Sequence, residues 1–349
     1  MTNNSPLLDD ILNQSQSLAR TVEYQCGEGR AALHEAARQL QNRSILLSGM
    51  GSSHFACHAL SAELAAHGLA AAVIDTAELL HYHHGAYRDA AAVLVSRSGE
   101  SIETLKVLPR LKAQGTFVVG VTDVADSPLA READRVVMIH GGRDHLVAVQ
   151  SYTATLIALQ LLGAALLDRF EQAHAELSAA VEALRAFVPA MAAASAGETW
   201  RAFFEDATVI HLLGRGRSLA SSHEGALLFN EVARLPSAAG EAAQFRHGPL
   251  EIVEAGFRAI VFASADHTRE LNVALARDIE RWGGQARLIG PGGLDRAWWT
   301  TPRVSPALAP LIEIVPVQCA ALRLAEWRGI VPGEFRAATQ VTRSEDGSN

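Results

Sequence analysis

Two glutamates and one histidine in the second half of the chain have types and spacing suited to moving protons. Glu224 and Glu231 are seven residues apart in a segment with helical periodicity, which places both carboxylates on one stripe, about 10 Å apart. His247 lies in RHGPLE, where Gly248 and Pro249 predict a loop. A loop histidine near a carboxylate can serve acid and base chemistry near neutral pH. The pattern indicates proton transfer, although a solvent-facing stripe and a surface histidine would explain the same residues.

A second set of candidates consists of serines in the first half of the chain. Its members are Ser52, Ser53, Ser96, Ser98 and Ser101. They form two clusters, and each follows a short apolar run and precedes a predicted helix. Such turns at the carboxyl ends of buried strands can place hydroxyl and backbone N–H groups around one phosphate. Arg97 can add a charged contact. Helix capping explains Ser52 and Ser53 equally well when they are considered alone.

Composition limits the classes of protein and partner. The chain has 349 residues, of which 49% are apolar and 19% charged, and its net charge is -8. These values predict a globular protein of two domains and argue against a nucleic-acid partner. Three separated cysteines and a polar, acidic N-terminus without a signal peptide predict a cytoplasmic protein. The longest apolar run, residues 153–167, is too short for a membrane span and predicts a buried helix.

A metal or organic cofactor is not expected. His54 and His58 are one helical turn apart, and histidines also cluster at 81–84, but neither group is followed by a further ligand with recognisable spacing. Proton transfer between neighbouring carbons needs no cofactor.

The sequence contains an internal repeat. Gly49, Gly51 and Ser53 recur as Gly214, Gly216 and Ser218, each 165 residues later. The apolar runs 91–95 and 259–263 correspond in the same way, although the second copy lacks the serine loop. Strands that alternate with helices predict an α/β fold with parallel sheets. The expected parts are a helical segment (1–42), a phosphate-binding repeat (43–169), a helical connector (170–199), a repeat with the catalytic glutamate (200–328) and a tail (329–349).

Several local expectations concern the second repeat. Residues 297–310 are expected to form a surface connection, 311–315 a last strand and 316–328 a last helix. The segment 240–246 is expected to be irregular. On the helix with the two glutamates, Leu228 shares their stripe, and the opposite face with Leu227 and Phe229 is expected to pack on a sheet.

Together, EGALLFNE, the AGE segment, RHGPLE and SRSGES resemble the sugar-isomerase (SIS) domains of the isomerase half of glucosamine-6-phosphate synthase and of related phosphosugar isomerases, deaminases and deglycases. The sixteen residues between Glu231 and His247 match the family's spacing. The resemblance implies two doubly wound, flavodoxin-like subdomains and a sugar phosphate substrate. It implies that Glu231 is the base and that His247 opens the sugar ring from the neighbouring subunit of a homodimer. The residues it implies for substrate binding are Ser52, Ser53, Ser96, Arg97, Ser98, Ser101, Val147, Glu224 and Gln340.

The chain departs from the family pattern at two lysines. Leu228 and Gln340 stand in their places, and neither residue can form a Schiff base. No cysteine of a glutamine-hydrolysing domain stands near the start. We therefore expect a phosphosugar isomerase or deaminase that acts on a hexose 6-phosphate or an amino-sugar phosphate. A sugar-phosphate sensor that has lost catalysis is the alternative. A plain nucleotide-binding α/β protein is disfavoured because the full GxGxxG pattern is absent.

Overall fold

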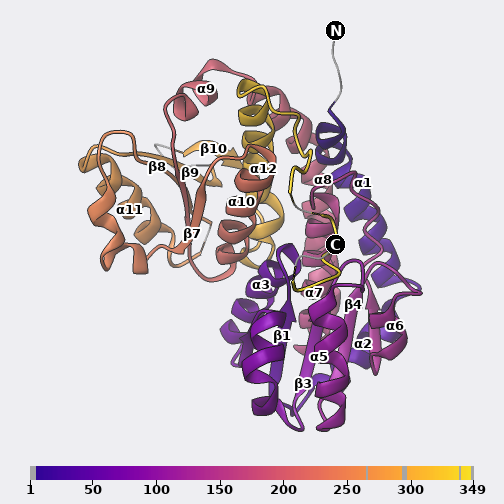
Figure 1. Ribbon diagram of the computed structural model, residues 1–349. Coiled ribbons are helices and arrows are strands. Elements are labelled where there is room, and N and C mark those ends of the chain that lie inside the picture. Colours follow the sequence, from indigo (N-terminus) through magenta and orange to yellow (C-terminus); the bar gives the residue numbers. More distant parts are fainter. Residues whose placement is uncertain (1–4, 265, 293–296, 338, 347–349) are drawn as a thin grey trace. The chain divides into compact units, whose positions relative to one another are not determined.

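The protein contains two five-stranded sheets in which every neighbouring pair of strands is parallel (Figure 1). The computed structural model describes residues 5–264, 266–292, 297–337 and 339–346. The first sheet has the order β2-β1-β3-β4-β5 and consists of β1 (Ile45–Gly49), β2 (Ala71–Val73), β3 (Ala91–Val95), β4 (Phe117–Thr122) and β5 (Arg135–Met138). The second has the order β10-β9-β8-β6-β7 and consists of β6 (Ile210–Gly214), β7 (Ser237–Glu241), β8 (Arg258–Phe262), β9 (Gln285–Pro291) and β10 (Ala297–Thr301). The predicted α/β repeat is confirmed.

Helices connect the strands of both sheets. In chain order they are α1 (Pro6–Cys26), α2 (Arg30–Leu40), α3 (Ser52–Ala66), α4 (Thr76–Glu78), α5 (Ile102–Ala113), α6 (Pro128–Glu132), α7 (Gln150–Leu166), α8 (Phe170–Ala194), α9 (Glu198–Phe204), α10 (Leu219–Val232), α11 (Arg269–Arg281) and α12 (Ala309–Trp327). The chain divides into two compact units. One comprises residues 1–15, 144–149 and 179–336, and the other comprises 16–143, 150–178 and 337–349.

The first sheet is buried on both faces, as parallel sheets usually are. All five residues of β1 and of β3 are buried. One face packs against α5 and α6 through a core that includes Leu94, Val107 and Leu129. On the other side α3 contacts β1 and β2, and α7 packs on α3. This layering holds the carboxyl ends of β1 and β3 side by side.

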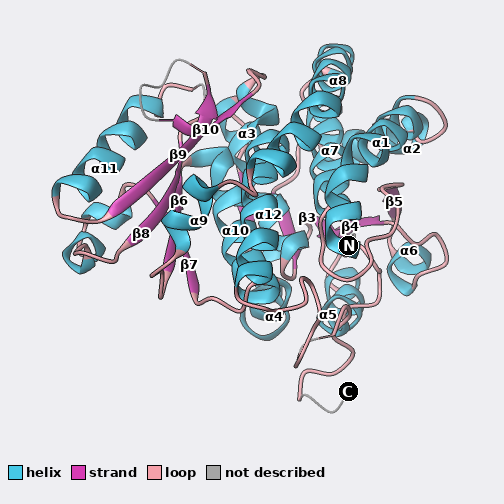
Figure 2. Ribbon diagram, turned by 90° about the horizontal axis from the view of Figure 1, so that it is seen from above, coloured by secondary structure: helices cyan, strands magenta, loops and turns pink. Residues whose placement is uncertain are grey.

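The second sheet is likewise covered on two sides (Figure 2). The α11 side forms a core with β6, β8 and β9 that includes Leu213, Val261, Ile279 and Leu288. On the other side α10 contacts β6 and β7, and α12 packs on α10. Helix α10, which carries Glu224 and Glu231, therefore lies between the sheet and α12.

Three local expectations for the second repeat were wrong. Residues 297–301 form the edge strand β10 rather than a surface connection, and 237–241 form the edge strand β7. Residues 311–315 belong to helix α12, which runs unbroken from Ala309 to Trp327. A short apolar run has the same pattern in a buried strand and in a helix buried on all sides, so periodicity could not separate them. The second repeat is also displaced by one residue at one strand. The sequence repeat predicted an apolar strand over 259–263, and β8 begins one residue earlier, at Arg258.

Two helices, Phe170–Ala194 and Pro306–Trp327, are long and apolar enough to cross a membrane by length and composition alone. In the second, 89% of the apolar window is buried inside the protein, as expected of a core helix.

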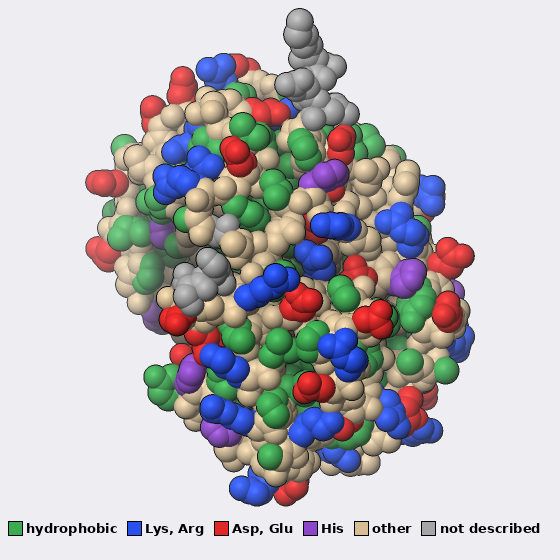
Figure 3. Space-filling model, turned by 45° about the vertical axis from the view of Figure 1, so that its right-hand side comes forward, with side chains coloured by type: hydrophobic (Ala, Val, Ile, Leu, Met, Phe, Trp, Pro, Cys, Tyr) green, Lys and Arg blue, Asp and Glu red, His purple; other side chains and the backbone are tan. Residues whose placement is uncertain are grey.

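On the face drawn in Figure 3, basic side chains are interspersed with acidic ones rather than gathered into one basic stripe.

Gly49, at the end of β1, is required by close backbone packing. A Cβ atom there would lie 2.9 Å from backbone atoms of Ser53, His54 and Val95. We expect Gly49→Ala to lower the free energy of unfolding, measured in urea, by about 1–3 kcal/mol because the turn into α3 must move. Gly85→Ala is the control, because nothing lies within 4 Å of its Cβ position. Equal effects of the two substitutions would contradict this prediction.

Candidate functional site

The first serine turn connects β1 to α3. Because Gly49 pairs with Val95 of β3, this turn lies beside the turn that follows β3. Gly51, with φ of +51°, is the N-cap of α3, and no side chain caps the helix. Ser52 and Ser53 are therefore the first two helical residues and are half-buried. Capping does not explain them, and they remain candidates for anion binding at the start of the helix.

The second serine turn, residues 96–101, gathers its hydroxyl groups through local hydrogen bonds. The Gly99 N–H donates to Ser96 Oγ (3.1 Å), and Ser96 Oγ lies 3.2 Å from Ser101 Oγ. The Glu100 N–H donates to Ser98 Oγ (3.2 Å). Gly99 has φ of +65°, which a residue with a side chain would adopt only under strain. The turn thus holds three hydroxyl groups in a fixed arrangement ahead of α5.

Arg97 adds positive charge to this turn. Its backbone carbonyl accepts hydrogen bonds from the Asp123 N–H (2.9 Å) and from Thr122 Oγ1 (3.1 Å). Burial raises the pKa of Asp123, while the Gly141 N–H and the charge of Arg97 act in the opposite direction. Arg97 is therefore fixed through its backbone and interacts electrostatically with the half-buried carboxyl group of Asp123.

The C-terminal tail docks on the helix that follows the second serine turn. The Ile102 N–H, at the start of α5, donates to the Thr342 carbonyl (3.1 Å). Arg343 pairs with Glu100 (2.8 Å). Gln340 precedes Thr342 by two residues, a separation of at most about 7 Å along the chain. The predicted position Gln340 therefore lies near the second serine turn.

Glu345 fastens this tail by pairing with Lys106 and with His81 (2.8 Å). These partners lower the pKa of Glu345. A lowered carboxyl pKa stabilises the docked tail above the group's ordinary pKa, and this stabilisation is lost as pH falls through the lowered value. We expect Glu345→Gln to lower the protection of the Ile102 amide against hydrogen exchange several-fold at neutral pH. The protection factor of this variant should no longer fall as pH is lowered. In Glu334→Gln, the matched tail variant, exchange should stay at the wild-type rate, and an equal change there would contradict the assignment.

In the other unit, α10 positions the two glutamates differently. Glu224 and Leu228 are fully buried, Glu231 is half-buried, and Leu227 is partly exposed. Burial is therefore not confined to the predicted face with Leu227 and Phe229 and includes Leu228 on the stripe of the two glutamates. The reason is that α10 packs against both the sheet and α12, so more than one face is buried.

Glu231 has the protonation behaviour of a general base. Burial raises its pKa to about 7. The end of α10 is fixed because Asn230 accepts a hydrogen bond from the Ser237 N–H (3.0 Å) at the start of β7. A carboxyl group with a pKa near the working pH is well matched to removing and returning a proton.

His247 lies where the sequence predicted, in a loop between two short 3-10 turns, Gln244–Arg246 and Pro249–Ile252. Its side chain is exposed. Buried Phe245 and the Arg246–Asp278 ion pair anchor the loop. Among the described residues there is no hydrogen bond between His247 and Glu231.

Val147 lies in the same unit as Glu231, in a loop that a long-range contact secures. Asp10 of α1 accepts hydrogen bonds from the His145 N–H (2.9 Å) and interacts with His145 Nδ1 (2.9 Å). Val147 is buried and packs near Gly333. The carbonyl of the next residue, Glu334, accepts a hydrogen bond from Arg234 (2.9 Å), which lies just after α10. Sequence reasoning missed Asp10 because an exposed-looking acidic residue in an N-terminal helix carries no local signal.

The candidates thus fall into two groups. The serine turns, Arg97 and Gln340 belong to one unit, and Glu224, Glu231, His247 and Val147 belong to the other. No group of three or more potential metal ligands occurs among the residues whose positions are described.

One known protein family matches both repeats of the chain. The SIS domain model matches residues 40–165 and 203–289, which is more than half of the chain. The chain belongs to the SIS domain family. The two matched regions contain the two parallel sheets, except for the last edge strand, and include both serine turns, α10 and His247.

Curated relatives of this SIS protein are longer. It is 29% identical to the glutamine–fructose-6-phosphate aminotransferase of Pyrobaculum aerophilum over 97% of its own length and 57% of the relative's. The enzyme of the same name from Bacillus subtilis is 29% identical over 68% of the chain and 40% of the relative. The chain therefore spans about half the length of these enzymes.

Solved structures share the fold over almost the whole chain. A Silicibacter pomeroyi protein assigned as a phosphosugar isomerase is 26% identical, with a TM-score of 0.77, and covers 94% of this chain and 99% of its own. The C-terminal domain of glucosamine-fructose-6-phosphate aminotransferase from Francisella tularensis has a TM-score of 0.78 at 22% identity, covering 94% and 98%. The second similarity concerns the fold alone.

Proposed function

We propose that this SIS protein is a phosphosugar isomerase or deaminase that moves a proton between C1 and C2 of a hexose 6-phosphate or an amino-sugar phosphate. The observation that carries the proposal is the pKa of Glu231, which burial raises to about 7. Family membership adds the class of substrate, because the homologous enzymes are named for fructose 6-phosphate and a similar solved protein for phosphosugar isomerisation.

The serine turns hold the phosphate. Hydroxyl groups, Arg97 and the N–H groups at the start of α3 supply hydrogen bonds and positive charge to an anion. The participating hydroxyls are those of Ser52, Ser53, Ser96, Ser98 and Ser101. We assign contacts with the sugar to Val147 and to the tail around Gln340, and Glu224 is a second carboxyl group of open role.

Glu231 performs the proton transfer. In its ionised form it removes the proton from C2 of the open-chain aldose phosphate; the electrons of that C–H bond form the C1–C2 double bond, and the carbonyl electrons move to O1 to give an enediolate. The same carboxyl group then returns the proton to C1, and the proton of the C2 hydroxyl passes to O1, which yields the ketose. In a 2-amino sugar phosphate the same transfer makes C2 an imine carbon, and addition of water to that imine releases ammonia. These steps need no protein imine. Leu228 and Gln340, which replace the family lysines, could not form one.

His247 opens the ring, and it comes from a second subunit of a homodimer. Its exposure on an anchored loop supports this assignment, because an exposed imidazole is accessible to a partner's substrate. A cytoplasmic location fits a substrate of this class.

The test is incubation with a panel of hexose 6-phosphates, glucosamine 6-phosphate and fructosamine 6-phosphates, with detection of isomers and released amine. Conversion of at least one compound, abolished by Glu231→Gln, is the expected result. Tight binding of a sugar phosphate without conversion of any compound would favour the alternative of a sensor, which the replacement of two lysines by Leu228 and Gln340 supports.

A further inference from the structure

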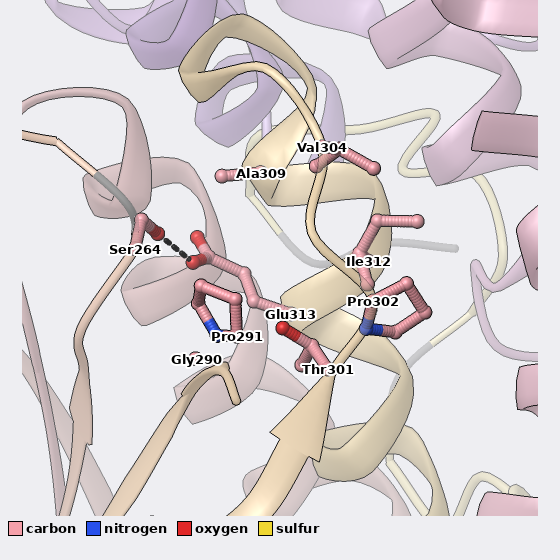
Figure 4. Close-up of a pocket in the computed structure, with 9 residues that line it drawn as sticks. All are labelled: Ser264, Gly290, Pro291, Thr301, Pro302, Val304, Ala309, Ile312 and Glu313. Atoms are coloured by element: carbon pink, nitrogen blue, oxygen red, sulfur yellow. Dashed lines mark hydrogen bonds between the residues drawn. The ribbon is translucent and has the colours of Figure 1, made fainter. Parts of the chain in front are cut away.

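Glu313, in the second repeat, is a fully buried carboxyl group surrounded by serine hydroxyl groups. Figure 4 shows the hydrogen bond that one of them, Ser264, makes with it. Ser264 donates to Glu313 Oε2 (2.5 Å), and Ser218 donates to the same oxygen (3.1 Å). Ser221 donates to Glu313 Oε1 (2.7 Å). All four side chains are buried, so the protein encloses an acidic group within a ring of hydroxyl donors.

Two of these serines, Ser218 and Ser264, occupy the position of the serine turns of the first repeat. The strand orders match if β6 is placed on β1 and β8 on β3. Ser218 then corresponds to Ser53, 165 residues earlier. Ser264 follows β8 as Ser96 follows β3, one residue further along. The second repeat thus retains hydroxyl groups at the carboxyl ends of the same two strands, although its sequence lacks the SRSGES pattern.

The helices that cover the two positions differ in charge. Helix α7 packs on α3 in the first repeat as α12 packs on α10 in the second. The 17 residues of α7, QSYTATLIALQLLGAAL, include no Asp or Glu. Helix α12 carries Glu313 near its start. Helix α12 therefore supplies a carboxyl group to the serine hydroxyls of the second repeat, whereas α7 has none to supply.

Little space remains beside this carboxyl group. The cavity bordered by Glu313, Ser264, Thr301 and Ile312 has a volume of about 10 Å³. That is room for about one water molecule and too little for a phosphate.

We propose that the Glu313 carboxyl group fills the second repeat's phosphate position and so confines phosphate binding to the first repeat. The inference rests on the proposed phosphate-binding role of the serine turns. It assigns Glu313 as a specificity residue, and it predicts that removal of its side chain opens a second site for inorganic phosphate or a phosphomonoester.

The test is the stoichiometry of inorganic phosphate bound to the full chain, measured by equilibrium dialysis with radiolabelled phosphate. The wild type should bind one phosphate per chain and Glu313→Ala two. Adding Ser264→Ala to Glu313→Ala should remove the second phosphate alone. Glu326→Ala, on the same helix, should bind one phosphate like the wild type. An unchanged stoichiometry in folded Glu313→Ala would overturn the proposal.

Failure of this proposal can be distinguished from failure of the proposed function. If the first repeat binds no phosphate, the wild type would bind none, whereas the gain caused by Glu313→Ala would still be measured. If Glu313→Ala does not fold by itself, the yield on refolding in phosphate is compared with that in chloride at equal ionic strength. Recovery in phosphate alone supports an anion site, and equal failure in both salts contradicts it.

Discussion

Glu231→Gln should lower kcat by about 10²- to 10⁴-fold while leaving KM for the sugar phosphate close to the wild-type value. Glutamine has nearly the same shape but cannot accept the C2 proton. The serine turns proposed to bind the phosphate are untouched, so loss of turnover without loss of binding is expected. Steady-state kinetics on the substrate identified from the panel, together with a binding measurement, would show it.

Stability separates this effect from misfolding. Because burial raises the pKa of Glu231 to about 7, the folded state favours the neutral carboxyl group. The stability contributed by this group is present below its ordinary pKa of 4.5 and is lost as pH rises through about 7. Glu231→Gln should therefore be at least as stable as the wild type at pH 8. Glu270→Gln, on the exposed side of α11, should keep full activity. Wild-type kcat in Glu231→Gln would remove Glu231 from the mechanism.

Ser96→Ala should raise KM by about 10- to 100-fold with a smaller effect on kcat. A hydrogen bond to a charged phosphate is worth about 1.5–3 kcal/mol. The Gly99 N–H would lose one of its two acceptors and keep the Ser96 carbonyl (3.0 Å). Inorganic phosphate should inhibit this variant correspondingly less. The measurement is the inhibition constant for phosphate together with KM.

Ser178→Ala is the matched control, because that hydroxyl group is exposed and bonds only its own helix, to the His174 carbonyl. It should leave both constants unchanged. If Ser96→Ala keeps the wild-type KM and phosphate inhibition, the second serine turn does not hold the phosphate.

Much of the fold was predictable because its signals are local. The glycine turns at Gly49 and Gly214, each after a short apolar run, predicted the two repeats and their parallel sheets. The edge strand β7 escaped prediction because SAAGE has small and polar residues and is only half-buried. Helix α12 was divided incorrectly because a helix buried on all sides has no amphipathic period.

The site was predictable in its chemistry but not in its surroundings. Glu231 and the serine turns could be proposed from residue type and spacing. The burial that raises the pKa of Glu231 depends on tertiary packing around α10, which residue spacing does not give. Glu313 was missed for the same reason, because its serine partners lie about 50 to 95 residues away. In the sequence it is one charged residue in an apolar helix.

The most direct test of the central claim is the pH dependence of deuterium incorporation at C2 of the substrate in deuterated water. If Glu231 is the base, exchange should rise as pH increases through about 7, reach a plateau, and be absent in Glu231→Gln. Exchange that does not depend on pH across this range, or that persists in Glu231→Gln at the wild-type rate, would contradict the assignment.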